Sequence, residues 1–309
     1  MNQLYKEYCK IELDKNPIDV KDNPLEMDRS AESTDTLYSQ TFCNVPRAEF
    51  WLRDDSSKKK FDRRHVCQTI AKIGNIMVMQ WAAHQQGIPW DECTCKTAAE
   101  HGHFELLQWL HLNGCPWDEG TCAYAAKNGH LEMLQWLREN GCPWDVRTCE
   151  VAAENGHLEV LKWAHANGCP WNENTSWLAA SNGHLEIVKW ARENGCPWNA
   201  ETCTKAAKGG HLEIVQWVHA NGCPWDETAC SNAAENGHFE ILQWLRENGC
   251  PWNEHTCASA AFGGQLEVLK LARENGCPWD AQAYFWAGRK KQSEMIQWLR
   301  DNGCPGSHD

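Results

Sequence analysis

The chain has 309 residues, of which 42% are hydrophobic and 23% charged, a composition typical of globular proteins. Its net charge is −13, and residues 66–309 carry 17 basic against 29 acidic side chains, which argues against a nucleic-acid-binding surface because such affinity depends on Lys and Arg. No apolar run is long enough to span a membrane, so no membrane association is expected.

The N-terminal region differs from the rest of the chain. Residues 1–37 are polar and mixed in charge, and they are expected to form a disordered tail. They lack the apolar core of a secretory signal and the Arg-rich, acid-poor composition of a transit peptide. Residues 38–65 are predicted to be an N-terminal cap or a linker. We therefore expect a cytoplasmic protein, with the nucleus as the alternative, and reduced cysteine thiols.

From residue 66 onward the chain follows a 27-residue period. One Trp row ends a tripeptide in the loops, and its members are Trp90, Trp117, Trp144, Trp171, Trp198, Trp225, Trp252 and Trp279. A second row consists of Trp109, Trp136, Trp163, Trp190, Trp217, Trp244 and Trp298, with Leu271 in place of one Trp. Residues 94–309 divide into eight units of 27, and residues 66–93 form a ninth unit with one residue inserted near Gln85. A period held this long predicts a stack of repeats.

The first half of each unit predicts a short helix. In the unit 148–174, Thr148 is a favourable N-cap residue. Cys149, Ala152 and Ala153 follow at helical spacing and form a small apolar stripe. This stripe would let a second helix pack closely against the first.

The second half of the unit predicts another helix. Asn155-Gly156 ends the first helix, since Gly adopts the left-handed conformation that terminates helices. The second helix is expected to start near His157 and to end at Asn167-Gly168. Five of its seven central residues are apolar, which is typical of a helix between neighbours in a stack. No segment alternates with a period of two, so the sequence predicts an all-α solenoid.

The unit T-C-x-x-A-A-x-N-G-H-L-E-V-L-K-W resembles the ankyrin repeat, which reads T-P-L-H-x-A-A-x-x-G-H followed by an apolar helix. The matching residues are Thr148, Ala152, Ala153, Gly156, His157, Leu161, Asn167 and Gly168. The resemblance covers residues 66–309 and implies a solenoid of helix-turn-helix repeats that binds proteins without catalysis. It also implies that the first helices line the concave side.

The unit departs from the ankyrin pattern in several respects. It has 27 residues instead of about 33, Cys replaces Pro after Thr, and the β-turn finger is reduced to Cys-Pro-Trp and a few polar residues. The shortened finger puts the family's usual fingertip contacts in question. Divergent short repeats of this kind are similar to those expanded in protists and in large DNA viruses of protists.

Both Trp rows are expected to serve packing. The helical row should face the stacked interior, and the loop row should lie over the loop of the neighbouring unit. A ladder of Trp side chains could instead stack single-stranded nucleic-acid bases, although the acidic charge of residues 66–309 opposes that function.

Fifteen of the 18 Cys fall into two rows. They are Cys115, Cys142, Cys169, Cys196, Cys223, Cys250, Cys277 and Cys304 in the loops, and Cys67, Cys95, Cys122, Cys149, Cys203, Cys230 and Cys257 in the first helices. Ile88, Ser176 and Tyr284 interrupt these rows, and a position that accepts Ile, Ser or Tyr is not expected to hold a metal ligand. The rows are therefore predicted to be buried packing thiols, with zinc binding and disulfides as the alternatives, and no cofactor is expected.

A His row precedes the second helices. Its members are His103, His130, His157, His184, His211 and His238. Asn75, Gln265 and Gln292 take its place in other units, and an amide can replace a hydrogen-bonding His but not a general base. The row is predicted to brace the turn. We find no catalytic grouping and no phosphate-binding loop, so no enzymatic activity is expected.

Positions whose chemistry changes from unit to unit need not pack, and they are the candidate partner-binding surface. The candidates on this variable strip are Lys96, Thr97, Tyr124, Lys127, Arg147, Glu150, Trp177, Leu178, Lys205, Asn232, His255 and Phe262. Tyr124, Trp177, Leu178 and Phe262 are aromatic or apolar among polar neighbours, as interface anchors are. Alternatively, Trp177 and Leu178 only compensate for the packing where Ser176 replaces Cys.

The sequence thus predicts a monomeric, non-enzymatic scaffold that binds a protein partner on its concave face. One alternative is a substrate adaptor that docks to a ligase or another machine through residues 1–65. The other is single-stranded nucleic-acid binding by the Trp rows. The last unit carries Arg289-Lys290-Lys291 in place of Asn-Gly, and it is predicted to cap the stack with polar residues.

Overall fold

A computed structural model describes residues 64–85 and 87–306 of the chain. All regular secondary structure in these two ranges is helical, which confirms the predicted all-α solenoid. The tail predicted at residues 1–37 lies outside the described residues. Most of the cap or linker predicted at 38–65 does so too, but its last two residues, Arg64 and His65, begin the first described helix.

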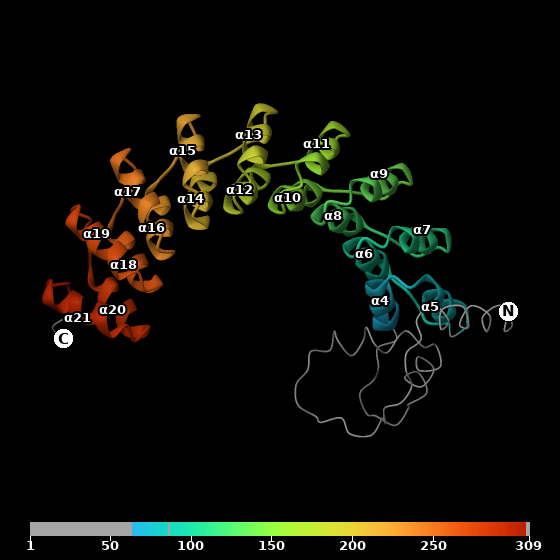
Figure 1. Ribbon diagram of the computed structural model, residues 1–309, viewed down its shortest axis with the longest axis horizontal. Helices are drawn as coiled ribbons and strands as arrows, with labels where there is room; N and C mark the ends of the chain where they lie inside the picture. The colour runs from blue at the N-terminus through green and yellow to red at the C-terminus, as the bar shows by residue number, and fades with distance from the viewer. Residues whose placement is uncertain (1–63, 86, 307–309) are drawn as a thin grey trace, which may run out of the picture. The chain divides into compact units, whose positions relative to one another are not determined.

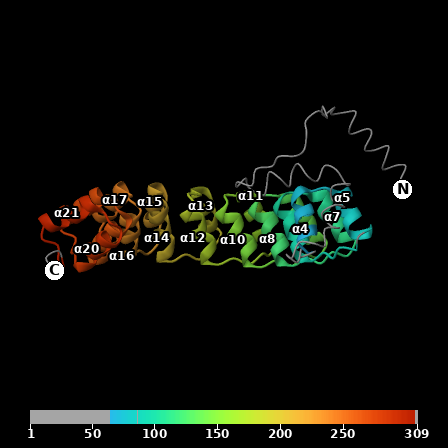
Figure 2. The same ribbon diagram turned by 90° about the horizontal axis from the view of Figure 1, so that it is seen from below.

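The described helices form two layers. The inner layer contains the first helix of each pair, namely α4 (Arg64–Ile73), α6 (Glu92–Glu100), α8 (Glu119–Lys127), α10 (Val146–Glu154), α12 (Glu173–Ser181), α14 (Ala200–Gly209), α16 (Glu227–Glu235), α18 (Glu254–Gly263) and α20 (Ala281–Arg289). The outer layer contains α5 (Ile76–Gln80) with the π-helix η1 (Trp81–Gln85), α7 (Phe104–Leu112), α9 (Leu131–Glu139), α11 (Leu158–Ala166), α13 (Leu185–Glu193), α15 (Leu212–Ala220), α17 (Phe239–Glu247), α19 (Leu266–Glu274) and α21 (Ser293–Asp301). Within this stack the first helices follow the inner side of a curve and the second helices follow its outer side (Figure 1). The perpendicular view shows the pairs following one another in a single row (Figure 2).

The first helices begin three residues earlier than predicted. In α10 the N-cap is Asp145, whose carboxylate accepts a hydrogen bond from the backbone N–H of Arg147 at 3.0 Å. Thr148 is instead buried in the first turn, and its hydroxyl has no hydrogen-bond partner. The prediction was wrong because Asp and Thr are both good N-cap residues. The structure assigns the cap to Asp145, whose negative charge also favours a helix N-terminus.

The predicted helix ends are confirmed. Helix α10 ends at Glu154, and Gly156 follows with a φ of 82°, the left-handed conformation that Gly adopts readily. Helix α11 then runs from Leu158 to Ala166, and Gly168 repeats the same conformation. Asn-Gly therefore ends both helices of this unit.

The core of each pair combines small and large apolar side chains. Cys149, Ala152 and Ala153 of α10 are fully buried, as are Leu161 and Ala164 of α11. The small side chains let neighbouring first helices pack directly on one another, whereas neighbouring second helices make fewer contacts. This difference in packing explains why the inner layer is the tighter one.

The first described pair contains an irregular second helix. Helix α5 ends at Gln80 and continues as the π-helix Trp81–Gln85. The sequence places one extra residue near Gln85, and a single inserted residue in a helix commonly produces a π-turn. The extra residue of unit 66–93 is thus accommodated within the second helix.

Candidate functional site

The twelve residues of the variable strip all lie on first helices of the inner layer. They are distributed over α6 (Lys96, Thr97), α8 (Tyr124, Lys127), α10 (Arg147, Glu150), α12 (Trp177, Leu178), α14 (Lys205), α16 (Asn232) and α18 (His255, Phe262). Each of these side chains is half-buried or exposed. Arg147 and His255 each precede the Thr at which the first helix is predicted to begin. They lie in the first turns of α10 and α18 because these helices begin earlier than predicted.

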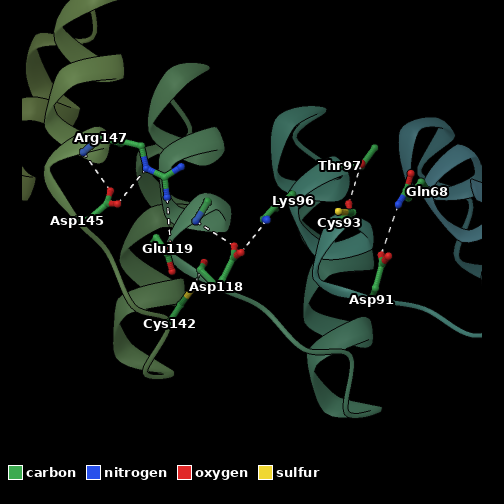
Figure 3. Close-up of polar contacts among 11 residues, drawn as sticks. Gln68, Asp91, Cys93, Lys96, Thr97, Asp118, Glu119, Cys142, Asp145 and Arg147 are labelled. Carbon is green, nitrogen blue, oxygen red and sulfur yellow. Dashed lines mark hydrogen bonds and ion pairs between the residues drawn. The ribbon is translucent and has the colours of Figure 1, made fainter. Parts of the chain in front are cut away.

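Polar side chains connect successive first helices at the N-terminal part of the strip (Figure 3). Lys96 of α6 forms an ion pair with Asp118, the N-cap of α8, at 2.7 Å, and this hydrogen bond raises the pKa of Lys96. Arg147 of α10 contacts Glu119 of α8 at 3.3 Å and its own N-cap Asp145 at 2.9 Å. Lys96 and Arg147 therefore link neighbouring helix pairs, although their side chains remain partly accessible to solvent.

The network continues at the centre of the strip. The side-chain amide of Asn174 donates to Glu150 Oε1 at 2.9 Å, and Trp177 Nε1 donates to Asn174 Oδ1 at 2.9 Å. Lys205 Nζ lies 5.5 Å from the centre of the Trp177 ring. Trp177 is thus half-buried with its polar atom satisfied and a cation over its ring.

Three apolar residues occupy the same register on three consecutive first helices. Tyr124 of α8, Val151 of α10 and Leu178 of α12 are 27 residues apart, and all three are half-buried; we call them the inner apolar strip. Thr97 and Lys205 hold this register on α6 and α14, so the apolar strip has polar neighbours at both ends. Val151 varies among the units at the same position as Tyr124 and Leu178, so the 27-residue period already places it in this register.

Phe262 lies apart from the inner apolar strip. Its ring packs edge-to-face on Trp286 of α20 at a centroid distance of 5.0 Å, and Lys290 Nζ lies 4.1 Å from its ring centre. Both contacts are made with the last described pair. Phe262 therefore helps to seal that pair onto the stack.

The His row braces neighbouring pairs. Nε2 of His157 donates to the backbone oxygen of Lys127 at 2.9 Å, and Nε2 of His184 donates to that of Glu154 at 3.0 Å. Gly129 has a φ of 74°, and a Cβ there would lie 2.7 Å from the His157 ring. This Gly thus supplies both the turn and the room for the imidazole of the next pair. Burial lowers the pKa of His130, which favours its neutral form.

The Cys rows are buried thiols. Cys169 Sγ donates to the backbone oxygen of the N-cap Asp145 at 3.4 Å, and equivalent bonds recur along the loop row. Where Ser176 replaces Cys, its hydroxyl lies 3.3 Å from Cys196 Sγ. Burial raises the pKa of Cys67 and of Cys223 to about 11, so these thiols stay protonated. The 16 Cys within residues 64–306 carry thiols and form no disulfides, and no three His, Cys, Asp or Glu side chains of the described part are placed to hold a metal ion.

The Trp rows pack differently from the prediction. Loop residue Trp117 stacks on His111 at 3.9 Å and meets Trp136 of the next second helix edge-on at 5.8 Å. At Trp144 the guanidinium of Arg138 lies 4.1 Å from the ring centre, and Trp163 of the next second helix meets the ring edge-on. The loop Trp thus lies on the next second helix and not on the next loop. The helical Trp side chains are half-buried, because they fill the gap between second helices and not the interior.

This packing bears on nucleic-acid binding. From Trp117 to Trp279, each loop Trp has a His or Arg side chain over one face, at 3.7–4.2 Å. Base stacking needs free aromatic faces. On each of these Trp side chains one face is already taken, and with the acidic charge this disfavours the nucleic-acid alternative.

The fold and the two-layered stack define a helical repeat protein, and comparison with known proteins gives its class. A family model described as ankyrin repeats (many copies) matches residues 95–138, 122–165, 149–192 and 203–253. Residues 95–192 and 203–253 thus match ankyrin repeats, which confirms the predicted resemblance. Ankyrin repeats are protein–protein interaction modules and generally lack enzymatic activity, so this chain contains a protein-interaction domain.

Two further comparisons complete this result. The crystal structure of the human ASB11 ankyrin repeat domain is similar with a TM-score of 0.43 and 20% sequence identity, over 51% of this chain and 84% of that chain. The search of curated proteins gave no match. In the part of the chain that the structure describes, no helix has both the length and the apolar character required to cross a membrane.

Proposed function

We propose that the chain is a monomeric, cytoplasmic scaffold of nine ankyrin-like repeats that binds a protein partner on its inner face. The observation that carries the proposal is the inner apolar strip. Tyr124, Val151 and Leu178 keep part of their apolar surface accessible, although each helix already has small buried residues for its core, Cys and Ala in α8 and α10 and Ser and Ala in α12. Partly exposed apolar side chains in register on adjacent elements are typical of binding surfaces.

The surroundings of the strip support this function. Trp177 lies next to Leu178 and is held by Asn174 and by Lys205. A pre-positioned Trp loses little conformational entropy on binding, and aromatic residues dominate interface energies. The partner we expect therefore presents apolar side chains to the strip and polar side chains to its two ends.

The test is quantitative affinity purification of the full chain with mass spectrometry. A variant with Tyr124→Ala and Leu178→Ala removes apolar surface from two inner helices. We expect the amount of at least one protein that co-purifies with the wild-type chain to fall at least tenfold with this variant. The matched control is Leu112→Ala on α7, because Leu112 is the most exposed large apolar residue of the described chain, at 81%, and lies in the outer layer.

The outcomes are distinguishable. Partner loss only in the inner-face variant, with an unchanged unfolding midpoint, supports the proposal. Equal retention in both variants contradicts it. Loss of the partner on deletion of residues 1–65 alone would favour the adaptor function.

A further inference from the structure

The helical Trp row is interrupted once, at Leu271 of α19. Beside this residue the structure contains a hollow of about 300 Å³ between α17 and α19. Its apolar lining is Leu242, Trp252 and Leu271. A volume of this size is at the lower end for small-ligand pockets.

The other repeats show what normally fills this position. Trp217 of α15 lies edge-on to loop Trp198 at 6.0 Å, while Arg192 covers Trp198 at 4.2 Å. At the hollow the loop Trp252 keeps its Arg246 at 4.0 Å, but Leu271 replaces the edge-on indole. The hollow therefore lies where the other repeats hold an indole ring.

The rest of the lining is polar and accessible. Gln243 donates to Glu247 Oε1 at 2.9 Å, and both side chains are exposed. Asn275 completes this side of the hollow. The Glu247 carboxylate has further acceptor capacity for an N–H donor, as the indole of Trp provides.

We propose that this hollow binds the indole of a Trp side chain presented by a partner protein. The ring would pack on Leu271 and meet Trp252 edge-on, as the chain's own Trp residues meet the loop Trp in the other repeats. Edge-to-face aromatic pairs are favourable beyond their buried area. The hollow is in the outer layer, so this proposal does not depend on the inner-face proposal.

The experiment uses two probes with the full chain. The first is 5-fluoroindole, followed by fluorine NMR, and the second is the peptide Gly-Ser-Trp-Ser-Gly, with Leu in place of Trp as its control. The variant Leu271→Trp restores the row and fills the hollow. We expect it to weaken both 5-fluoroindole and the Trp peptide at least tenfold relative to wild type.

A gain-of-function variant controls for indirect effects. In the Leu271→Trp background, Trp217→Leu opens an equivalent hollow beside Trp198, and indole binding should return. Thermal unfolding of each variant checks that the fold is retained. A restored site would show that the missing indole alone creates the binding position.

Four results would overturn the proposal. Equal probe binding by wild type and Leu271→Trp would show that the hollow is not the site, and no binding to wild type would show that it is no site at all. Trp51 is the one Trp of the sequence outside the described residues, and tighter probe binding by Trp51→Ala would mean that this side chain is the occupant. Probe affinity that falls as the protein concentration rises would mean that a second copy of this chain occupies the hollow.

Discussion

At the scale of single residues, two side chains compete as the N-cap of α10, namely Asp145 and Thr148. If Thr148 capped α10, replacing its hydroxyl would destabilise the protein. In the structure this hydroxyl is buried without a partner, and burying an unsatisfied hydroxyl costs about 1–3 kcal/mol. We therefore expect Thr148→Val, which keeps the side-chain shape, to raise the free energy of unfolding by about 1 kcal/mol. Urea denaturation measures the change.

The control for this substitution is the residue that forms the cap. Asp145→Ala removes the acceptor of the Arg147 N–H and should lower the free energy of unfolding by about 1 kcal/mol. If Thr148→Val lowered the free energy of unfolding and Asp145→Ala left it unchanged, Thr148 and not Asp145 would be the N-cap.

At the scale of elements, the loops hold adjacent second helices together through aromatic pairs. Trp171 stacks on His165 at 3.7 Å and meets Trp190 edge-on at 5.6 Å. Trp190→Leu should remove the edge-on partner of Trp171, as Leu271 does for Trp252. Because an edge-to-face pair contributes about 0.5–1.5 kcal/mol, we expect Trp171→Ala to destabilise less in the Trp190→Leu background, by about 1 kcal/mol. Urea unfolding of the four proteins in this double-mutant cycle gives the coupling, and additive effects would contradict the pairing.

The same elements show how far the sequence could lead. The helix ends were predictable because Asn-Gly marks them in unit after unit. The contact between Trp117 and Trp136 was not, since every row has the same 27-residue period and a shared period does not tell which rows touch. Likewise, Leu271 is visible as an interruption, but only the structure shows the hollow beside it.

The candidate site was only partly predictable for a related reason. Variation among units located the inner helices, because variable positions cannot be shared core positions. It could not separate Lys96, which links two helices, from Leu178, for which no such polar link arises. That distinction depends on side-chain contacts across repeats, which the spacing within one unit does not contain.

At the scale of the whole stack, buried thiols report how the repeats open. A central pair is held by neighbours on both sides, whereas α20 and α21 of the 309-residue chain pack against one described pair. In repeat proteins stability is the sum of each repeat and its interfaces, so end repeats open more readily. Only thiolates react, and burial raises the pKa of Cys196 and of Cys304, so labelling of either requires local opening.

We therefore expect pulsed iodoacetamide labelling, read by mass spectrometry, to modify Cys304 faster than Cys169 or Cys196. Cys93 is the internal control: burial raises its pKa as well, but its side chain is only half-buried whereas the other 15 Cys of the described residues are buried, so it should react without opening of the stack. Equal rates for Cys304 and Cys196 would mean that the stack opens as one cooperative unit. A gradient from the end to the centre would instead show that each interface contributes separately, as the repeated packing of one unit requires.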